Sequence, residues 1–387
     1  MKCHWFDSHH CNSCGLMNLS YSESLNKKEQ ELLNLFYKKP LNLQKTIESK
    51  PVFGSRNKAK LAVRGRAQDI EFGFYDSELN FKKLEECPLH LEGINDLLPE
   101  LTTSFKKYNI VPYDLHLKKG ELKYVIISKS PASKELLIRF VVRSKESFDR
   151  LKKMAREWEE RGQNRHVMSV NIQPDHKAIF EGDEEIVVTE SKMLNYQLGD
   201  VHLNLGAKSF FQVTPNVAFQ LYDRVRSFLN EQKIHSLLDL YCGVGAFSFF
   251  AASTCQKVLG VELSSEAIEA ANSSKMNNKI LGQLDFKSLD VELFLKQVSD
   301  NFEAILVNPP RRGLSSTIIE NMLRLKPKMI IYSSCNASTL ARDVMLLEKD
   351  YAIFSSQIFD MFPFTEHYET LMILVRKQEF LCQSLTV

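Results

Sequence analysis

Beyond residue 216 the chain alternates between strand and helix patterns, and this alternation limits the possible folds more than any other feature. Residues 216–232 have the apolar spacing of a helix. Helical segments separate several of the later apolar runs. These runs have the length of buried strands and cover 236–241, 257–263, 302–307, 327–334 and 370–377. Strands that alternate with helices form a largely parallel sheet with helices on both faces. The sequence therefore predicts an α/β fold with a doubly wound, Rossmann-like domain over residues 201–387.

The chain before residue 200 has a different pattern. Strand-like runs cover 58–65, 70–76, 121–130, 135–144, 167–174 and 184–191, and residues 145–161 read as an amphipathic helix. We predict an N-terminal α+β region here, divided into a cysteine-bearing segment over 1–90 and a central α+β domain over 91–200. The early helical pattern at 24–38 is expected to pack on the C-terminal domain.

The length and composition restrict the class of protein. A chain of 387 residues is long enough for two or three domains, and 44% hydrophobic with 25% charged residues is typical of a soluble globular protein. No apolar run approaches a membrane span, and the N-terminus lacks a signal-peptide core. We expect a cytoplasmic protein without membrane association. The net charge of +2 neither requires nor excludes a nucleic-acid partner.

The stretch DLYCGVGAF, residues 239–247, follows a strand and opens a helix. Its two glycines let the backbone turn tightly and approach a ligand. Glu262 ends the next strand, where an acid can accept hydrogen bonds from ribose hydroxyls. The pattern departs from a dinucleotide fingerprint because residue 248 is serine. Two alternatives stay open: a turn without a ligand, and an acid that only caps the following helix.

Two further strand ends carry polar residues. The strand over 302–307 runs into Asn308 and two prolines, which make a stiff turn with a carboxamide at the sheet edge. Arg311 and Arg312 follow, and they are either phosphate partners or solvated loop residues. The strand that begins at Met329 ends in polar residues and Cys335, which is a candidate nucleophile or a small core residue.

A thiol at this edge has a chemical task if the substrate is a pyrimidine. Addition of a thiolate to C6 of uracil turns C5 into a nucleophile that can attack a sulfonium methyl group. A base must then remove the C5 proton before the thiolate leaves. Four candidate bases lie around the start of the last strand: Asp360, Glu366, His367 and Glu369. Spacing alone does not choose among them, and each is otherwise an ordinary solvated loop residue.

Four cysteines fall in the first quarter of the chain, with the spacing Cys3-x7-Cys11-x2-Cys14 and a distant Cys87. Four thiolates suit a zinc ion or an iron–sulfur cluster, and spacing does not decide between them. Four histidines near these cysteines are possible zinc ligands: His4, His9, His10 and His90. Three other cysteines receive no chemical role: Cys242, Cys255 and Cys382.

Together, five motifs resemble those of the RNA uracil-C5 methyltransferases: SFFQVTPNVA, DLYCGVGAF, NPPRRG, YSSCN and DMFPFTEHYE. The resemblance implies a methyltransferase that uses S-adenosyl-L-methionine, with Cys335 as the nucleophile and Glu369 as the base. It assigns the cofactor-binding positions to Gln212, Tyr241, Glu262 and Asn308. Many relatives have Asp in place of Asn308. An amide cannot act as a base or carry a charge, so the resemblance does not assign to Asn308 any role that needs a carboxylate.

The same resemblance bears on the N-terminal cysteines. The branch that acts on 23S ribosomal RNA carries a [4Fe-4S] cluster with this spacing, which implies four cluster ligands: Cys3, Cys11, Cys14 and Cys87. We expect the cluster to shape the protein or its RNA site, because no second redox centre or radical motif is recognisable.

The cluster motif begins at residue 3, which leaves no room ahead of it for the β-barrel RNA-binding domain of a related branch. The resemblance therefore implies the compact type of enzyme, with uridine 747 of 23S ribosomal RNA as its favoured target. We expect a monomer without a protein partner. Two alternatives stay open: the same chemistry on another ribosomal or transfer-RNA uridine, and a non-catalytic iron–sulfur protein that binds RNA or senses redox state.

Direct RNA contacts are harder to predict. Arg56, Lys58 and Lys60 alternate along one strand and share a face, which is either a phosphate-binding or an ordinary solvated surface. Three phenylalanines can contact the target ring or pack locally, and core packing is expected for at least two of them: Phe210, Phe211 and Phe362.

Overall fold

The computed structural model describes residues 3–37, 41–66, 68–133, 135–161, 166–177 and 179–379, so Cys382 lies outside the described residues. The chain divides into two compact units, and each is described by itself. The first unit comprises Met1–Asn12, Pro51–Leu198 and Asn204–Ser209, and the second comprises Ser13–Lys50, Gly199–Leu203 and Phe210–Val387.

The second unit is built on an eight-stranded sheet with the order β1-β16-β17-β15-β14-β11-β12-β13. Five neighbouring strands, β15 to β13 in that order, are parallel, and β17 runs antiparallel between β15 and β16. The strands are β1 (Leu43–Ile47), β11 (Ser236–Leu240), β12 (Lys257–Glu262), β13 (Gln283–Ser288), β14 (Ala304–Val307), β15 (Met329–Ser334), β16 (Tyr351–Phe359) and β17 (Glu369–Arg376).

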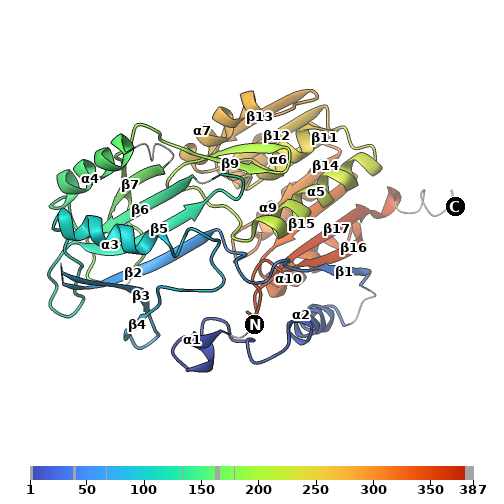
Figure 1. The fold of residues 1–387 in the computed structure, drawn as a ribbon. Helices are drawn as coiled ribbons and strands as arrows, with labels where there is room; N and C mark the ends of the chain where they lie inside the picture. Colours follow the sequence, from blue (N-terminus) through green and yellow to red (C-terminus); the bar gives the residue numbers. More distant parts are fainter. Residues whose placement is uncertain are drawn as a thin grey trace. The chain divides into compact units, whose positions relative to one another are not determined.

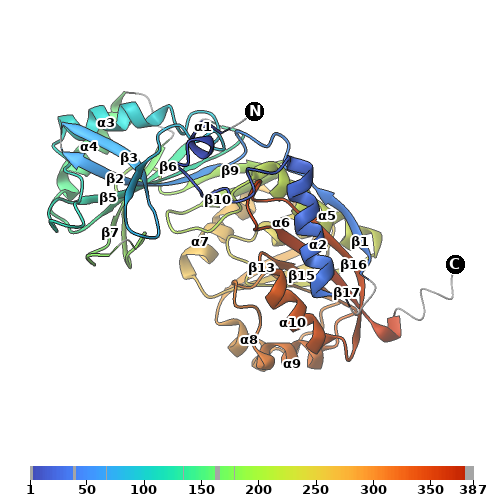
Figure 2. The same ribbon diagram turned by 90° about the horizontal axis from the view of Figure 1, so that it is seen from below.

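Helices cover both faces of this sheet, which confirms the doubly wound prediction. One face packs against α2 (Tyr21–Leu35), α8 (Val291–Gln297), α9 (Ser316–Leu325) and α10 (Ala337–Leu347). The view from below shows α8, α9 and α10 side by side (Figure 2). The other face carries α5 (Pro215–Glu231) and α6 (Ala246–Ala252), which pack on each other through aromatic side chains. Between β12 and β13 the chain forms α7 (Ser265–Ser274).

The early helix packs on the core of this second unit, as predicted, but its bounds differ from the expected 24–38. It begins after Ser20, whose side chain accepts from the Glu23 N–H while the Glu23 carboxylate accepts from the Ser20 N–H. This reciprocal pair is a capping box, visible in the sequence as Ser-x-x-Glu. Leu32 and Phe36 then enter the hydrophobic core of the sheet.

A buried ion pair ties this helix to the sheet. The Lys28 ammonium lies 2.6 Å from the Asp360 carboxylate, and neither side chain is more than 1% exposed. The Tyr21 hydroxyl donates to the same carboxylate, and Lys28 also donates to the Phe362 carbonyl. The pair therefore holds the loop after β16 as well as the helix.

We expect Lys28→Met to lower the free energy of unfolding by about 3–5 kcal/mol, because it leaves a buried carboxylate without its charge partner. Urea denaturation followed by circular dichroism measures the change. Lys27→Met is the matched control: its 3.1 Å pair with Glu366 is exposed and is worth less than about 1 kcal/mol. Equal losses in the two variants would contradict the role given to Lys28.

The first unit contains a seven-stranded sheet with the order β4-β3-β2-β5-β6-β7-β8. Only β6 and β7 are parallel. Two helices, α3 (Leu97–Lys107) and α4 (Phe148–Glu160), pack on one face of this sheet and enclose its core, and Figure 1 shows them next to each other. The strands are β2 (Lys58–Arg66), β3 (Asp69–Tyr75), β4 (Phe81–Lys83), β5 (Leu122–Lys129), β6 (Leu136–Val142), β7 (His166–Ile172) and β8 (Glu184–Val187).

Every strand that the sequence predicted is present, but several elements were missed, including the nine-residue strand β16 and the partly exposed strand β13. Edge strand β1 has exposed Gln44 and Lys45, so its sequence lacks the apolar run expected of a parallel strand. The short pair β9 (Leu194–Leu198) and β10 (Val201–Leu205) was also missed. Within the described ranges, no helix has both the length and the apolar character needed to cross a membrane.

Candidate active site

A cavity of about 990 Å³ opens in the second unit, at the carboxyl ends of its parallel strands. Parallel α/β sheets bind ligands at this edge because the strand ends and the following loops converge there. All six residues that the resemblance assigns to the cofactor and to catalysis line this one cavity: Gln212, Tyr241, Glu262, Asn308, Cys335 and Glu369.

The glycine turn forms one wall of the cavity. Tyr241, Gly243 and Gly245 all have positive φ, at 60°, 54° and 81°. A Cβ on Gly245 would lie 2.7 Å from the Phe286 ring, so only glycine fits where α6 begins. The turn therefore brings the backbone close to the cavity, as the sequence predicted for a ligand-binding loop.

The Glu262 carboxylate is held at the cavity edge by backbone donors. The Gly243 N–H donates to it at 3.2 Å and the Ser264 N–H at 2.9 Å. The cap of the following helix is the Ser264 side chain, which accepts from the Ala267 N–H. Capping therefore does not occupy Glu262, and its remaining lone pairs can accept from a ligand.

A second acid lies on the strand that leads into the glycine turn. Asp239 is fully buried, and burial raises its pKa to about 7, although a 2.5 Å hydrogen bond from the Ser248 hydroxyl opposes the rise. Its other oxygen, Oδ1, has no hydrogen-bond partner among the described residues. An acceptor left unpaired inside a protein is costly. This oxygen therefore fits a site whose ligand or water supplies a donor.

The turn that begins at Asn308 is tied to neighbouring elements. The Asn308 N–H donates to the Leu240 carbonyl at 3.3 Å. The Asn336 side-chain amide donates to the Arg311 carbonyl at 3.0 Å, and the Arg342 guanidinium donates to the Arg312 carbonyl at 2.9 Å. These bonds hold the loop while the exposed side chains of both arginines remain at the cavity.

Cys335 follows β15 directly, and Asn336 caps α10. Burial raises the pKa of the Cys335 thiol, the nearby Glu369 raises it further, and the Arg311 guanidinium opposes both effects. A half-buried thiol at a cavity edge, with a cation within reach, can become a stabilised thiolate when a substrate is bound.

Glu369 begins β17 and is only 1% exposed. Burial raises its pKa to about 7, and the Ser333 hydroxyl donates to it at 2.5 Å. In the antiparallel register Ser334 lies opposite Thr370, so Cys335 and Glu369 occupy the next pair of positions. A carboxyl group with this pKa is suited to proton transfer near neutral pH.

The other candidate bases have different surroundings. Asp360 is neutralised by Lys28, and Glu366 is exposed beside Lys27. His367 lines the cavity but is exposed, with its ring 6.2 Å from that of Phe362. Burial and access therefore favour Glu369, where spacing favoured none of the four.

The aromatic prediction was wrong in part, because only one of the three phenylalanines is buried. Phe211 packs against Tyr222 with ring centroids 6.2 Å apart. Phe210 is 73% exposed at the cavity, and Phe362 is half-buried there. Two aromatic faces are therefore available to a flat ligand.

Sequence reasoning missed two residues of this site. Ser333 holds Glu369, and its position two residues before Cys335 on the same strand face was the available signal. Asp290 lines the cavity and caps α8, accepting from the Glu292 and Leu293 N–H groups at 3.0 Å. Its signal was a polar residue between a strand and a helix.

Three of the four N-terminal cysteines belong to the first unit. The segment that carries Cys3 and Cys11 is held by hydrogen bonds from the Trp5 indole to the Glu86 carbonyl and between the His10 ring and the Lys83 carbonyl. Burial raises the pKa of Cys87, and the Cys11 and Cys3 thiols raise it further, so the three lie within electrostatic range. Cys14 is buried and belongs to the second unit.

The predicted basic face of β2 is only partly solvated. Lys58 is half-buried, and burial lowers its pKa to about 8. Lys60 is exposed, pairs with Glu181 at 3.4 Å and lies over the Phe180 ring. Arg56, just before the strand, has a buried Nε without a partner among the described residues. A continuous row of phosphate-binding cations is not formed.

Sequence comparisons match this chain to one enzyme family. The family model described as tRNA (uracil-5-)-methyltransferase matches residues 20–377. The chain is 38% identical to the 23S rRNA (uracil(747)-C(5))-methyltransferase RlmC of Xenorhabdus bovienii, over 97% of this chain and 99% of that protein. It is 36% identical to the Escherichia coli protein of the same name, over 97% of this chain and 100% of the relative.

A solved structure shares the fold of most of the chain. The tRNA (uracil-54, C5)-methyltransferase of Pyrococcus abyssi, in complex with S-adenosyl-L-homocysteine, superposes with a TM-score of 0.77 and 26% identity. The match covers 94% of this chain and 85% of the Pyrococcus chain.

Proposed function

The chain belongs to the tRNA (uracil-5-)-methyltransferase family, and on that premise we propose that it transfers a methyl group from S-adenosyl-L-methionine to C5 of uridine 747 in 23S ribosomal RNA. The observation that carries the chemistry is the pairing of Cys335 with the buried Glu369 at the edge of the cavity. The target is supported by relatives of nearly the same length that are named for this uridine.

The described residues fit the cofactor. The cavity is large enough for a nucleoside with an extended side chain and a pyrimidine ring, Glu262 has lone pairs to spare, and Asp239 has an unpaired buried oxygen. We assign cofactor binding to Gln212, Tyr241, Glu262 and Asn308. Bound S-adenosyl-L-methionine supplies an electrophilic methyl carbon.

Cys335 supplies the nucleophile that makes C5 reactive. Its thiolate adds to C6 of the target uracil, which moves electron density through the ring to C5 and O4. Arg311 stabilises the thiolate beforehand. The exposed guanidinium of Arg312 at the same cavity is a donor for the charge that develops on O4.

Glu369 completes the cycle after methyl transfer. Its carboxylate accepts the proton from C5, the C5–C6 double bond re-forms and the Cys335 thiolate leaves. Ser333 orients the carboxylate, and burial keeps its pKa near the working pH. The two chemical groups approach the target ring from adjacent strand ends.

A cofactor-binding role for Glu262 predicts a selective defect. We expect Glu262→Gln to raise the KM for S-adenosyl-L-methionine about tenfold, because a charged acceptor for hydroxyl groups becomes a neutral one. Initial rates at varied cofactor concentration measure the change. The control is Glu266→Gln, an exposed residue of the adjacent helix. An unchanged KM in Glu262→Gln would exclude the assigned contact.

We also propose that Cys3, Cys11, Cys14 and Cys87 hold a [4Fe-4S] cluster. Among the described residues, no group of three or more Cys, His, Asp or Glu side chains is arranged to hold a metal ion, so the proposal rests on the resemblance. The motif spacing shared with the cluster-bearing branch supports this proposal, as does the electrostatic proximity of Cys3 and Cys11 to Cys87. Cys14 follows Cys11 by three residues, so the chain keeps it within about 11 Å.

The role that we assign to the cluster is structural, and it enters no step of methyl transfer. Analysis of iron, sulfide and zinc in protein purified without oxygen distinguishes a [4Fe-4S] cluster from a zinc ion at these cysteines. About four irons and four sulfides per chain, lost together in Cys11→Ser, is the expected result. Stoichiometric zinc without iron would contradict it.

The substrate assignment is tested by methylation in vitro. Full-length protein is incubated with labelled S-adenosyl-L-methionine and either a 23S rRNA fragment that contains uridine 747 or a tRNA transcript. We expect 5-methyluridine in the rRNA fragment alone. Label in the tRNA alone would contradict the rRNA assignment. It would indicate that the chain carries out the same reaction on tRNA, the substrate class of the Pyrococcus enzyme.

A further inference from the structure

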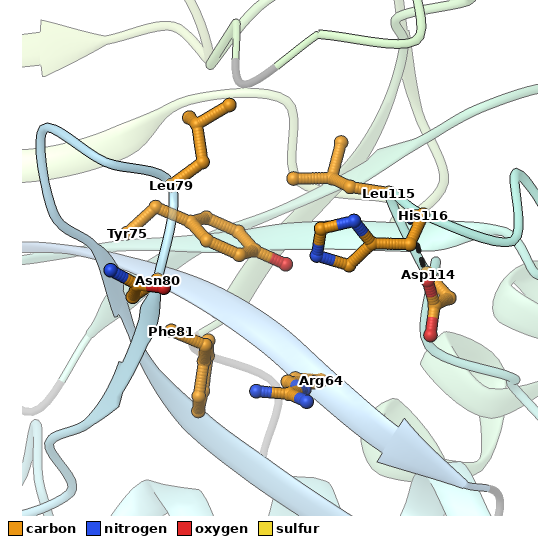
Figure 3. A pocket seen from close by; sticks show the side chains of 8 residues that line it. All are labelled: Arg64, Tyr75, Leu79, Asn80, Phe81, Asp114, Leu115 and His116. Atoms are coloured by element: carbon orange, nitrogen blue, oxygen red, sulfur yellow. Dashed lines mark hydrogen bonds between the residues drawn. The ribbon is translucent and has the colours of Figure 1, made fainter.

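The first unit contains a second pocket, on the sheet face opposite α3 and α4. Its volume is about 260 Å³. Two of its aromatic residues, Tyr75 and Phe81, pack on a small apolar cluster that includes Ala62 and Tyr124. Figure 3 shows the eight lining residues: Arg64, Tyr75, Leu79, Asn80, Phe81, Asp114, Leu115 and His116. None of them belongs to the active-site cavity.

Flat surfaces gather in this pocket. The Tyr75 and Phe81 rings are half-buried, 5.7 Å apart and inclined by 71°. The Arg64 guanidinium lies over the Phe81 ring, 5.5 Å from its centroid. Rings and guanidinium planes of this kind are the surfaces on which proteins stack unpaired RNA bases.

A carboxylate also lines this pocket, that of Asp114. Asp114 Oδ1 accepts from the His116 and Leu117 N–H groups, at 2.8 and 2.9 Å. Its Oδ2 accepts no hydrogen bond from any described residue and has no ion pair within 4.0 Å. The Tyr75 hydroxyl points toward the His116 ring in Figure 3, so further polar groups border the space.

The segments that line the pocket also carry exposed cations. Arg64 and Arg66 lie on the same face of β2, and both are exposed. Lys118 and Lys119, also exposed, end the loop that begins at Asp114. These cations attract the phosphate backbone of a nucleic acid. The carboxylate of Asp114, in contrast, accepts a hydrogen bond and therefore favours a base that carries a donor.

We propose that this pocket binds one unpaired, amino-bearing nucleobase of the RNA substrate, at a nucleotide other than the target uridine. The proposal rests on the proposed function and adds a second contact to it. The volume is below the range of sites for whole cofactors and suits a single base. Adenine, cytosine and guanine can donate an amino hydrogen to Asp114 Oδ2. Uracil is disfavoured, because its only ring donor lies between two carbonyl oxygens that repel a carboxylate.

The test compares the affinities of the full-length protein for short oligo(A), oligo(C) and oligo(U) by fluorescence anisotropy. Wild type is expected to bind oligo(A) and oligo(C) about tenfold more tightly than oligo(U). Asp114→Asn keeps the acceptor for the two backbone N–H groups but places a donor where Oδ2 lies. It should therefore abolish or reverse this preference.

Two charge variants separate the pocket from general attraction to RNA. Arg64→Gln is expected to weaken binding of all three homopolymers about fivefold, and to raise the KM for the 23S rRNA fragment by a similar factor. Lys153→Gln, which removes an exposed charge from α4 on the opposite face, should change neither. The melting temperature of each variant is measured to establish that it is folded.

The outcomes separate this inference from the proposed function. No base preference in wild type, or a preference that folded Asp114→Asn retains, would overturn the pocket assignment even if the protein methylates 23S rRNA. A preference that Asp114→Asn removes would support the pocket even if no 5-methyluridine were formed, in which case the proposed function alone would fail.

Discussion

Cys335→Ala is expected to abolish methyl transfer, with a loss of at least about 10⁴-fold in kcat. The physical reason is that C5 of uracil is a poor nucleophile until a thiolate has added to C6. Cys335 and Cys242 both line the cavity, but burial holds the pKa of the Cys242 thiol well above its usual value, so Cys335 is the thiol suited to this step. Transfer of label from S-adenosyl-L-methionine to RNA measures the loss. The cofactor affinity should be retained, because Cys335 is not among the residues assigned to bind it.

The covalent step has its own readout. In RNA that carries 5-fluorouridine at the target, fluorine replaces the proton that the base must remove, so the adduct forms and cannot be resolved. Wild type is expected to give a protein–RNA species that survives denaturing electrophoresis, and Cys335→Ala is expected to give none. Cys255→Ala is the control, since that thiol is buried and bonded to the Ile234 carbonyl. An adduct that persists in Cys335→Ala would show that another residue is the nucleophile.

Glu369→Gln is expected to stop the cycle at a later point, with turnover reduced about 10³-fold. The amide cannot accept the C5 proton, so a methylated adduct should accumulate even with natural uridine. Intact-protein mass spectrometry detects this species. In the wild type, log kcat should rise with pH and level off above about 7, because burial sets that pKa for Glu369 and only the deprotonated carboxylate acts as a base.

The pH dependence and the adduct together identify the base. Glu366→Gln is the matched control, because this neighbouring carboxylate is exposed and pairs with Lys27. It should leave the turnover and the pH profile unchanged. If Glu369→Gln kept wild-type turnover, the C5 proton would have to leave to another group, and His367 at the same cavity would be the next residue to replace.

The sequence was sufficient for the parts of the fold that have strong periodicity. The central parallel strands β11, β12, β14 and β15 are largely apolar, so they could be recognised one by one, and a cavity-lining residue stands at or just after the end of each: Tyr241, Glu262, Asn308 and Cys335. Elements with weak patterns were missed. Edge strand β1 is half polar because one of its sides has no neighbouring strand, and its pairing with β16 joins residues more than 300 positions apart.

The sequence could list the candidate residues of the site but could not rank them. Asp360 and Glu369 are both acids near the last strand, and only the three-dimensional structure shows that Lys28 neutralises the first while the second is buried without a cation. Ser333 was missed for the same reason, because its role depends on the register between β15 and β17. Likewise, the pocket at Arg64 joins residues from three separate segments.

The methylation of uridine 747 is tested most directly by mass-spectrometric mapping of 5-methyluridine in 23S ribosomal RNA from a bacterial strain that lacks its own enzyme for this uridine. The strain is complemented with this gene or with its Cys335→Ala variant at equal protein levels. We expect 5-methyluridine at position 747 with the wild-type gene and unmodified uridine with the variant. Unmodified uridine at 747 with both genes, from wild-type protein that is folded and abundant, would contradict the assigned target.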